Sequence, residues 1–300
     1  MPYKTTIFDW FLLACLVVVW GSSFVMTKIA VASIASEWIV ALRIVIGAAV
    51  LLLCAMLARQ MPDLSLKTWI KYVWLGIIGN TLPFFLITWG LKFIPSGISG
   101  LLMGTIPILI LLLAHFFLPG ERLNRFRILG FVSGFAGLLV IIDPSNLAKL
   151  GIAGDALWGE LAVVLACFCY AVHSISAKRL GFDRPLAQAS GVLIGGAVGA
   201  VVLALILAPQ GFAEAEPRAL WAALGLGLLP TGLATVIMYK LMERTSPTMV
   251  AQSNYLVPIY AVIFGAVTLG EKLEWSVLLA LSLVLFGIFI SRVESKPSSR

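Results

Sequence analysis

The sequence carries the stretch Gly120-Glu121-Arg122-Leu123, and the similar stretch Gly270-Glu271-Lys272-Leu273 follows it 150 residues later. Several other pairs share this spacing, or one within two residues of it. These pairs are Trp20 and Tyr170, Lys28 and Lys178, Gly137 and Gly287, Pro95 and Pro247, and Pro107 and Pro258. Apolar helices use few residue types, so one such match is weak and the alternative is a set of unrelated helices. Several agreeing matches predict an internal repeat.

The composition predicts a membrane protein. Apolar residues make up 61% of the chain and charged residues 12%, and the mean hydropathy is +1.04. These values are unusual for soluble domains. A helix of about 20 apolar residues crosses the roughly 30 Å of hydrocarbon in a bilayer. The chain has ten apolar runs of about this kind, at residues 10–31, 38–57, 69–93, 97–118, 128–142, 156–177, 186–208, 220–241, 249–269 and 275–290. We therefore expect an all-α membrane protein with ten transmembrane helices.

An odd number of spans in each repeat has a topological consequence, because the second copy then inserts upside down relative to the first. We expect residues 1–147 to form the first five-helix repeat, residues 148–293 the second, inverted repeat, and residues 294–300 a cytoplasmic tail. In inverted repeats the substrate site lies near the membrane midplane, where the halves meet. The two halves can exchange roles, which provides alternating access.

The basic residues of the loops are strongly sorted. With ten spans, fifteen Lys and Arg residues fall on the side that holds both termini, and five fall on the other side. Because basic loops stay in the cytoplasm, both termini are expected there. Run 128–142 is the shortest, and if it did not cross, the counts would become ten and ten.

Helix disruption near the midplane indicates where a substrate would bind. Proline removes a helical hydrogen bond and frees backbone groups that need a cavity or a neighbour. Pro83 and Pro230 interrupt runs three and eight, and Pro107 and Pro258 interrupt runs four and nine. The residues near this depth that could line a small pocket are Trp20, Ser22, Ser23, Asn80, Phe84, Met103, Tyr170, His173, Tyr239, Asn254 and Tyr255. Alternatively, the serines bond their own helix carbonyls, the asparagines join two helices, and Phe84 and Met103 face lipid.

Charge inside the runs is scarce. No carboxylate lies near a midplane, although proton-coupled transporters commonly use one. Facilitated transport is therefore favoured, with coupling through His173 as the alternative. Arg43 is the one basic residue well inside a run. We expect it to pair with Glu37 or with carbonyl groups near the outer surface, in preference to meeting a substrate carboxylate.

Other functional classes find little support. The cysteines, Cys15, Cys54, Cys167 and Cys169, all fall inside apolar runs and imply neither disulfides nor a metal site. No catalytic motif identifies a membrane-embedded enzyme, whereas a channel remains compatible with the layout. We expect a small-molecule substrate and a lipid bilayer as partners, no cofactor, no metal ion, no nucleic acid, and a monomer. The first run is expected to be a retained helix and not a signal peptide, because Trp20 and Lys28 have counterparts in the second half.

Specific motifs resemble those of a known family. They are Trp20-Gly21-Ser22-Ser23-Phe24, Ala41-Leu42-Arg43 and the two Gly-Glu turns. The chain resembles the EamA-type transporters of the drug/metabolite transporter superfamily, and is most similar to the aromatic amino acid exporters of bacterial inner membranes. The resemblance implies export of small metabolites, amino acids included, through a central cavity. It also implies that Trp20, Phe84, Tyr170, Tyr239 and Tyr255 suit aromatic side chains, while serine and asparagine groups take the amino and carboxylate ends.

Overall fold

The described part of the chain is all-helical. The computed structural model describes residues 5–119, 123–142, 154–181, 184–245 and 247–291, and these form helices joined by turns, without a strand among them. The predicted boundary between residues 147 and 148, the predicted tail 294–300 and the stretch Gly120-Glu121-Arg122 lie outside the described residues.

Eight helical segments are long and apolar enough to cross a membrane. They are α1 (Ile7–Ala30), α2 (Ser36–Leu57), α3–η1–α4 (Leu66–Gly76, Ile77–Thr81, Leu82–Gly90), α5–α6 (Ser96–Met103, Ile106–Phe117), α7 (Arg125–Ile142), α9 (Asp155–Leu180), α10 (Pro185–Leu207) and α11–η2–α12 (Pro217–Leu226, Gly227–Leu233, Ala234–Arg244). The short run 128–142 gains length because α7 begins at Arg125.

The last two predicted spans fall on shorter apolar helices. These are α14 (Ser253–Leu269), which follows the short α13 (Pro247–Val250), and α15 (Trp275–Ser291), with 17 residues each. Such a helix is about 25 Å long, somewhat less than the usual hydrocarbon thickness. A multi-span membrane protein is thus confirmed, while the count of ten crossings stays a prediction.

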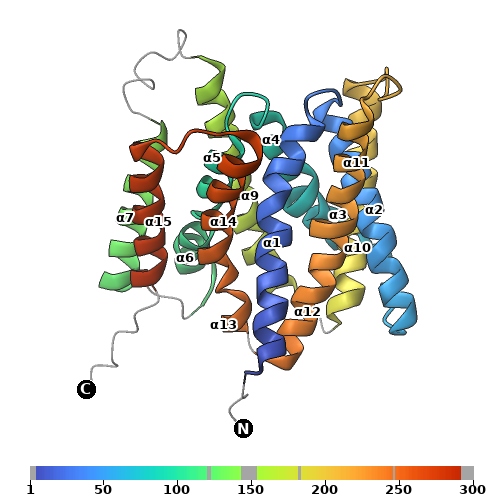
Figure 1. Cartoon of the computed structure of the whole chain (residues 1–300). Coiled ribbons are helices and arrows are strands. Elements are labelled where there is room, and N and C mark those ends of the chain that lie inside the picture. The colour runs from blue at the N-terminus through green and yellow to red at the C-terminus, as the bar shows by residue number, and fades with distance from the viewer. Residues whose placement is uncertain (1–4, 120–122, 143–153, 182–183, 246, 292–300) are drawn as a thin grey trace, which may run out of the picture.

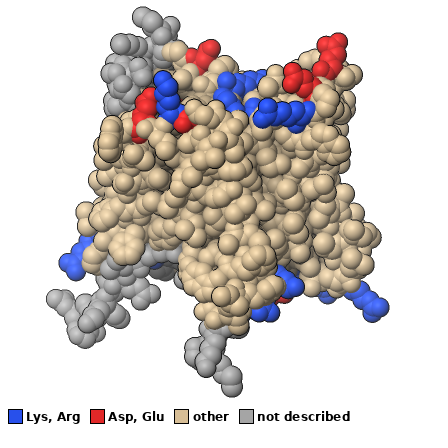
Figure 2. Space-filling model, in the orientation of Figure 1, with Lys and Arg blue, Asp and Glu red and all other residues tan. Residues whose placement is uncertain are grey.

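The helices lie side by side, and α1 begins at the same end of the molecule at which α15 ends (Figure 1). In the view of Figure 2, the Lys, Arg, Asp and Glu side chains gather at the two ends of the helices, and the band between them is uncharged. This distribution fits a bilayer around the middle of the molecule, because charged side chains are costly in hydrocarbon.

Helices at corresponding places in the two halves of the chain pack against corresponding partners in the other half. Helix α1 packs against α14 and against α11 and α12, and α9 packs correspondingly against α5, α6 and α4. Helix α2 packs against α10, and α7 packs against α15. The last pair approaches closely, since a Cβ atom on Gly287 would lie 2.6 Å from the carbonyl oxygen of Gly130. Glycine is what lets these helix backbones come so close.

Helix interruptions lie beside Pro83, Pro107 and Pro230, whereas the predicted interruption at Pro258 is wrong because α14 continues through it. Two π-helical segments, η1 and η2, begin 150 residues apart at Ile77 and Gly227. Pro230 lies inside η2, and α5 ends just before the turn that leads to α6. A π-helical turn departs from the α-helical hydrogen-bond pattern and is frequent at functional sites. These segments therefore direct attention to the interior between the halves.

Candidate functional site

A cavity of about 510 Å³ lies between segments of both halves. Its lining comes from α1, α2, η1, α4, α5 and α6 in the first half of the chain, and from α9, α10, η2, α12 and α14 in the second half. Nine of the residues singled out from the sequence line it, namely Trp20, Ser23, Asn80, Phe84, Met103, Tyr170, His173, Tyr239 and Asn254. The structure thus brings these residues together, although their contact with a substrate stays a prediction.

Two residues singled out from the sequence do not line the cavity. The Ser22 hydroxyl donates a hydrogen bond to the Val19 carbonyl oxygen at 3.2 Å. The Tyr255 hydroxyl donates to the Ile288 carbonyl oxygen of α15 at 3.2 Å. Because successive side chains on a helix point in different directions, Asn254 faces the cavity while its neighbour Tyr255 turns toward α15. The cavity therefore lends no support to the predicted contact of Ser22 and Tyr255 with a substrate.

Aromatic side chains form much of the wall and are held by specific contacts. The Trp20 indole nitrogen donates to the Pro230 carbonyl oxygen of η2 at 3.2 Å. The rings of Phe84 and Tyr170 meet edge to face, with their centroids 6.4 Å apart. Trp20 and Tyr170, which are 150 residues apart, thus occupy the cavity wall from α1 and α9.

Arg43 lies in this cavity, contrary to the expectation that it would pair near the outer surface. Its side chain is 8% exposed, and its Nε donates to the Thr231 hydroxyl oxygen of η2 at 2.9 Å. Its guanidinium carbon lies 3.7 Å from the centre of the Phe84 ring. The sequence contains a signal for this location, because a lone basic residue inside an apolar run is a candidate functional group.

The other polar side chains of the described lining carry no permanent charge. The side-chain amides of Asn80 and Asn254 make no hydrogen bond to any described residue, whereas Ser23 donates to the Trp20 carbonyl oxygen of its own helix at 2.6 Å. His173 Nδ1 lies 3.1 Å from the Leu75 carbonyl oxygen, so Nδ1 carries the proton because a carbonyl only accepts. The described lining contains no Asp or Glu. Such a site suits a small molecule with an apolar part and a few polar groups.

Sequence reasoning missed part of the lining. Gly104, which was not among the residues singled out from the sequence, lines the cavity, as do Thr27, Ser174, Ser253 and Val257. Gly104 follows α5 directly, at the interruption that precedes Pro107. A glycine beside a helix break is a usable signal for such a position, because it leaves room next to freed backbone groups.

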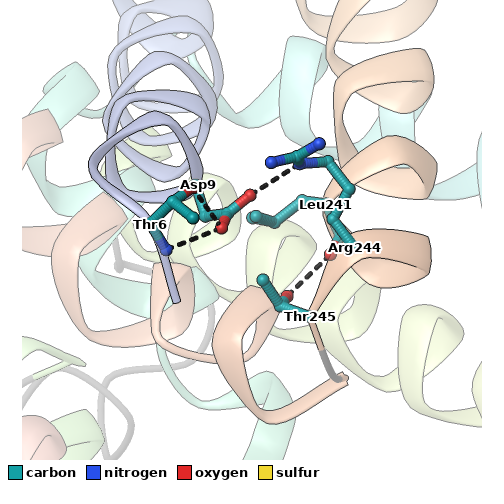
Figure 3. Close-up of polar contacts among 5 residues, drawn as sticks. All are labelled: Thr6, Asp9, Leu241, Arg244 and Thr245. Atoms are coloured by element: carbon teal, nitrogen blue, oxygen red, sulfur yellow. Dashed lines mark hydrogen bonds and ion pairs between the residues drawn. The ribbon is translucent and has the colours of Figure 1, made fainter. Parts of the chain in front are cut away.

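An ion pair ties two lining helices together at the end where α1 begins. The Arg244 Nε of α12 donates to Asp9 Oδ1 of α1 at 2.7 Å, and Asp9 Oδ2 accepts from both the Thr6 backbone nitrogen and the Thr6 hydroxyl (Figure 3). Asp9 is 2% exposed. At the other end of α1, Lys28 Nζ donates to the carbonyl oxygens of Leu91 and Ile94 at 2.7 and 2.9 Å. Charged side chains thus link the first end of α1 to α12 and its last turn to the segment that follows α4.

Comparisons with known proteins agree with this description. The model of the EamA-like transporter family matches residues 9–143 and again residues 157–293. The uncharacterized transporter YoaV of Bacillus subtilis is 28% identical over 275 residues, which cover 91% of this chain and 92% of that protein. The uncharacterized inner membrane transporter YedA of Escherichia coli is 24% identical, with coverage of 93% and 88%.

Two further comparisons bear on a substrate and on the fold. A probable terminal-alkyne amino-acid exporter of Streptantibioticus cattleyicolor is 30% identical over 217 residues, which cover 71% of this chain and 67% of that protein. A solved crystal structure superposes with a TM-score of 0.67 at 21% identity and covers 94% of this chain and 96% of its own. At that identity the likeness concerns the fold alone.

Proposed function

Because this chain belongs to the EamA-like transporter family, we propose that it moves small metabolites, amino acids among them, out of the cell through the cavity between its two halves. The transport is facilitative and works by alternating access. The substrate has an apolar or aromatic portion, which Trp20, Phe84 and Tyr170 contact.

The cavity is the observation that carries this proposal. Ligand sites of small molecules usually measure about 300–1,000 Å³ and combine apolar walls with a few polar groups. The cavity of about 510 Å³ lies in this range and offers aromatic walls together with Asn80 and Asn254. The relative named a probable terminal-alkyne amino-acid exporter supports amino acids as the substrate class.

Alternating access rests on an inverted repeat of five plus five spans. Three observations support it: one family model matches both halves, the packing partners of the halves correspond, and η1 and η2 begin 150 residues apart. In this arrangement α14 and α15 also cross, and the termini share one side of the membrane. We place that side in the cytoplasm and the protein in a bacterial inner membrane, in line with the loop cations and with the relative named an inner membrane transporter.

Proton-coupled export of another metabolite is the second candidate. His173 favours it, because this imidazole lines the cavity and titrates near neutral pH in its unperturbed state. The described lining holds no carboxylate to share a proton with it, so facilitative transport is the better supported mechanism.

Flux measurements test the proposed function. Purified full-length protein in liposomes, loaded with labelled L-phenylalanine, is assayed with and without a pH gradient. We expect saturable efflux that is unaffected by the gradient and stimulated by unlabelled substrate on the opposite side. Efflux that fails to saturate would indicate a channel, and absent efflux for all amino acids would contradict the substrate class.

The predicted orientation has its own test. In protein freed of its four cysteines, Leu64→Cys lies in the turn after α2 and Lys92→Cys lies in the turn after α4, at exposed positions. An impermeant thiol reagent outside intact cells should label Lys92→Cys and spare Leu64→Cys. The reverse pattern would place the termini outside.

A further inference from the structure

We propose that Arg43 is the anion-binding group of the cavity and restricts its ligands to molecules with one carboxylate next to an apolar portion. The proposal rests on the proposed function for the role of the cavity and goes beyond it, because it assigns a residue and a charge to the substrate.

The first argument is an unsatisfied set of donors. A guanidinium group has five N–H donors. Only one of those of Arg43, the Nε–H, is hydrogen-bonded within the described residues, and its acceptor is the Thr231 hydroxyl. The other four N–H groups lack a protein acceptor there, although the side chain is only 8% exposed. The terminal nitrogens are not among the fully buried side-chain atoms that lack a partner, so they are accessible from the cavity, where a ligand with acceptor atoms can bind them.

The second argument is an uncompensated charge. No carboxylate of the described residues forms an ion pair with Arg43, and Arg43 is the only permanently charged side chain in the described lining. A buried cation without a counterion is strongly disfavoured in a membrane protein. An anionic ligand supplies the missing charge, whereas a cationic ligand would be repelled.

The third argument is the orientation of the guanidinium group, which leaves one of its edges accessible to a ligand. The Phe84 ring covers one face of the guanidinium at 3.7 Å, and Thr231 holds its Nε edge. The edge that carries the terminal nitrogens remains available to a ligand. Two parallel N–H groups match the two oxygens of a carboxylate, and this bidentate geometry is stronger and more selective than a single contact.

The charge of Arg43 has no counterpart at the position 150 residues later. Leu193 lies 150 residues after Arg43, also lines the cavity and is apolar. The cavity therefore offers one anion-binding group and not a symmetric pair. We infer that it accepts a single carboxylate, and that the remainder of the ligand contacts apolar and aromatic side chains.

Binding of paired probes tests this inference. Labelled 3-phenylpropionate and labelled phenethylamine share an aromatic ring and differ in carrying a carboxylate or an ammonium group. Purified full-length protein in detergent should bind 3-phenylpropionate at least about tenfold more tightly, the factor expected for a charge-assisted hydrogen bond. Arg43→Met should reduce the ratio of the two affinities to about one, and Arg43→Lys should keep the preference with weaker binding.

Controls separate this role from a structural one. Lys240→Met removes an exposed cation of α12 outside the cavity and should leave the ratio unchanged. Arg43→Met should not lower the unfolding temperature, because an apolar side chain replaces an uncompensated charge. A lower unfolding temperature with an unchanged affinity ratio would overturn the inference and assign Arg43 to helix packing.

The remaining outcomes are also decisive. Displacement of 3-phenylpropionate by chloride at equal concentration would identify an inorganic anion site, and equal binding of both probes would remove the charge selectivity; either result overturns the inference. Amino-acid flux with an unchanged ratio in Arg43→Met would leave the proposed function standing without this inference. Arg43-dependent binding of 3-phenylpropionate without amino-acid flux would support this inference and contradict the proposed function.

Discussion

Thr81 and Thr231, which are 150 residues apart, both join a π-helical segment to a helix of the other half. The Thr231 hydroxyl donates to the carbonyl oxygen five residues earlier, that of Leu226, at 2.9 Å, and the Thr81 hydroxyl lies 3.5 Å from the corresponding Gly76 carbonyl oxygen. Thr81 donates to the Gly196 carbonyl oxygen of α10 at 2.8 Å, whereas Thr231 accepts from Arg43 of α2. The two positions share a structural role, and only Thr231 connects to the cavity charge.

This difference predicts unequal effects of the same substitution. Thr231→Val and Thr81→Val should each lower the free energy of unfolding by about 1–2 kcal/mol, because each leaves a buried polar group without its partner. Only Thr231→Val should also weaken carboxylate binding, because Thr231 positions Arg43. Thermal unfolding and binding of 3-phenylpropionate measure the two effects, and equal binding losses in both variants would contradict the assignment.

Asn254 and Tyr255 provide a paired test of the cavity wall. Asn254→Ala removes an amide that faces the cavity, and KM for L-phenylalanine should rise about fivefold to tenfold, as expected for one lost hydrogen bond. Tyr255→Phe removes a hydroxyl that bonds to α15 and should leave KM unchanged. The elution profile of both variants should match that of the wild type. A rise in KM for Tyr255→Phe alone would reverse the assignment of the two residues.

Close packing of α7 against α15 predicts a stability effect remote from the cavity. Gly287→Ala would bring its Cβ within 2.6 Å of the Gly130 carbonyl oxygen and 2.9 Å of the Gly134 backbone nitrogen. Because these are backbone atoms, the helices must separate, and we expect a loss of about 1–3 kcal/mol. Gly154→Ala is the matched control, since a Cβ atom there meets nothing within 4 Å. Equal unfolding temperatures for the two variants would show that the helix pair adapts.

The ion pair between Asp9 and Arg244 predicts a change in access to the cavity. Asp9→Asn should weaken the tie between α1 and α12 and favour opening at the end where α1 begins. A cysteine in place of Met238, which lines the cavity on α12, should then react severalfold faster with a thiol reagent from that side. Asp63→Asn is the control, because Asp63 lies in the connection between α2 and α3 and accepts hydrogen bonds from the neighbouring Ser65 and Thr68. Equal labelling rates in all proteins would mean that the ion pair does not restrict opening.

The sequence predicted most of the helical segments, but not the partners of the charged residues. Proline and polar residues at the same depth indicated Asn80 and Asn254, since a helix break has a local signature. The pairs Arg43–Thr231 and Asp9–Arg244 join residues 188 and 235 positions apart. The hydrophobic periodicity of a sequence does not predict contacts between residues so far apart in the chain, because these contacts depend on how the helices pack. The predicted repeat would relate positions 150 residues apart, and it does not identify contacts.

The two histidines of the chain allow a test of proton coupling. His173 lines the cavity and donates through Nδ1 to the Leu75 carbonyl oxygen, whereas His115 lies on α6 outside the described lining. Asparagine can reproduce the Nδ1 donor and does not titrate, so His173→Asn preserves the hydrogen bond while it removes the proton site. If transport is facilitative, the wild type, His173→Asn and His115→Asn should show the same flux with and without a pH gradient. Gradient-driven flux in the wild type and in His115→Asn, lost in His173→Asn, would replace facilitation with proton coupling through His173, because only a titrating group can carry the proton across with the substrate.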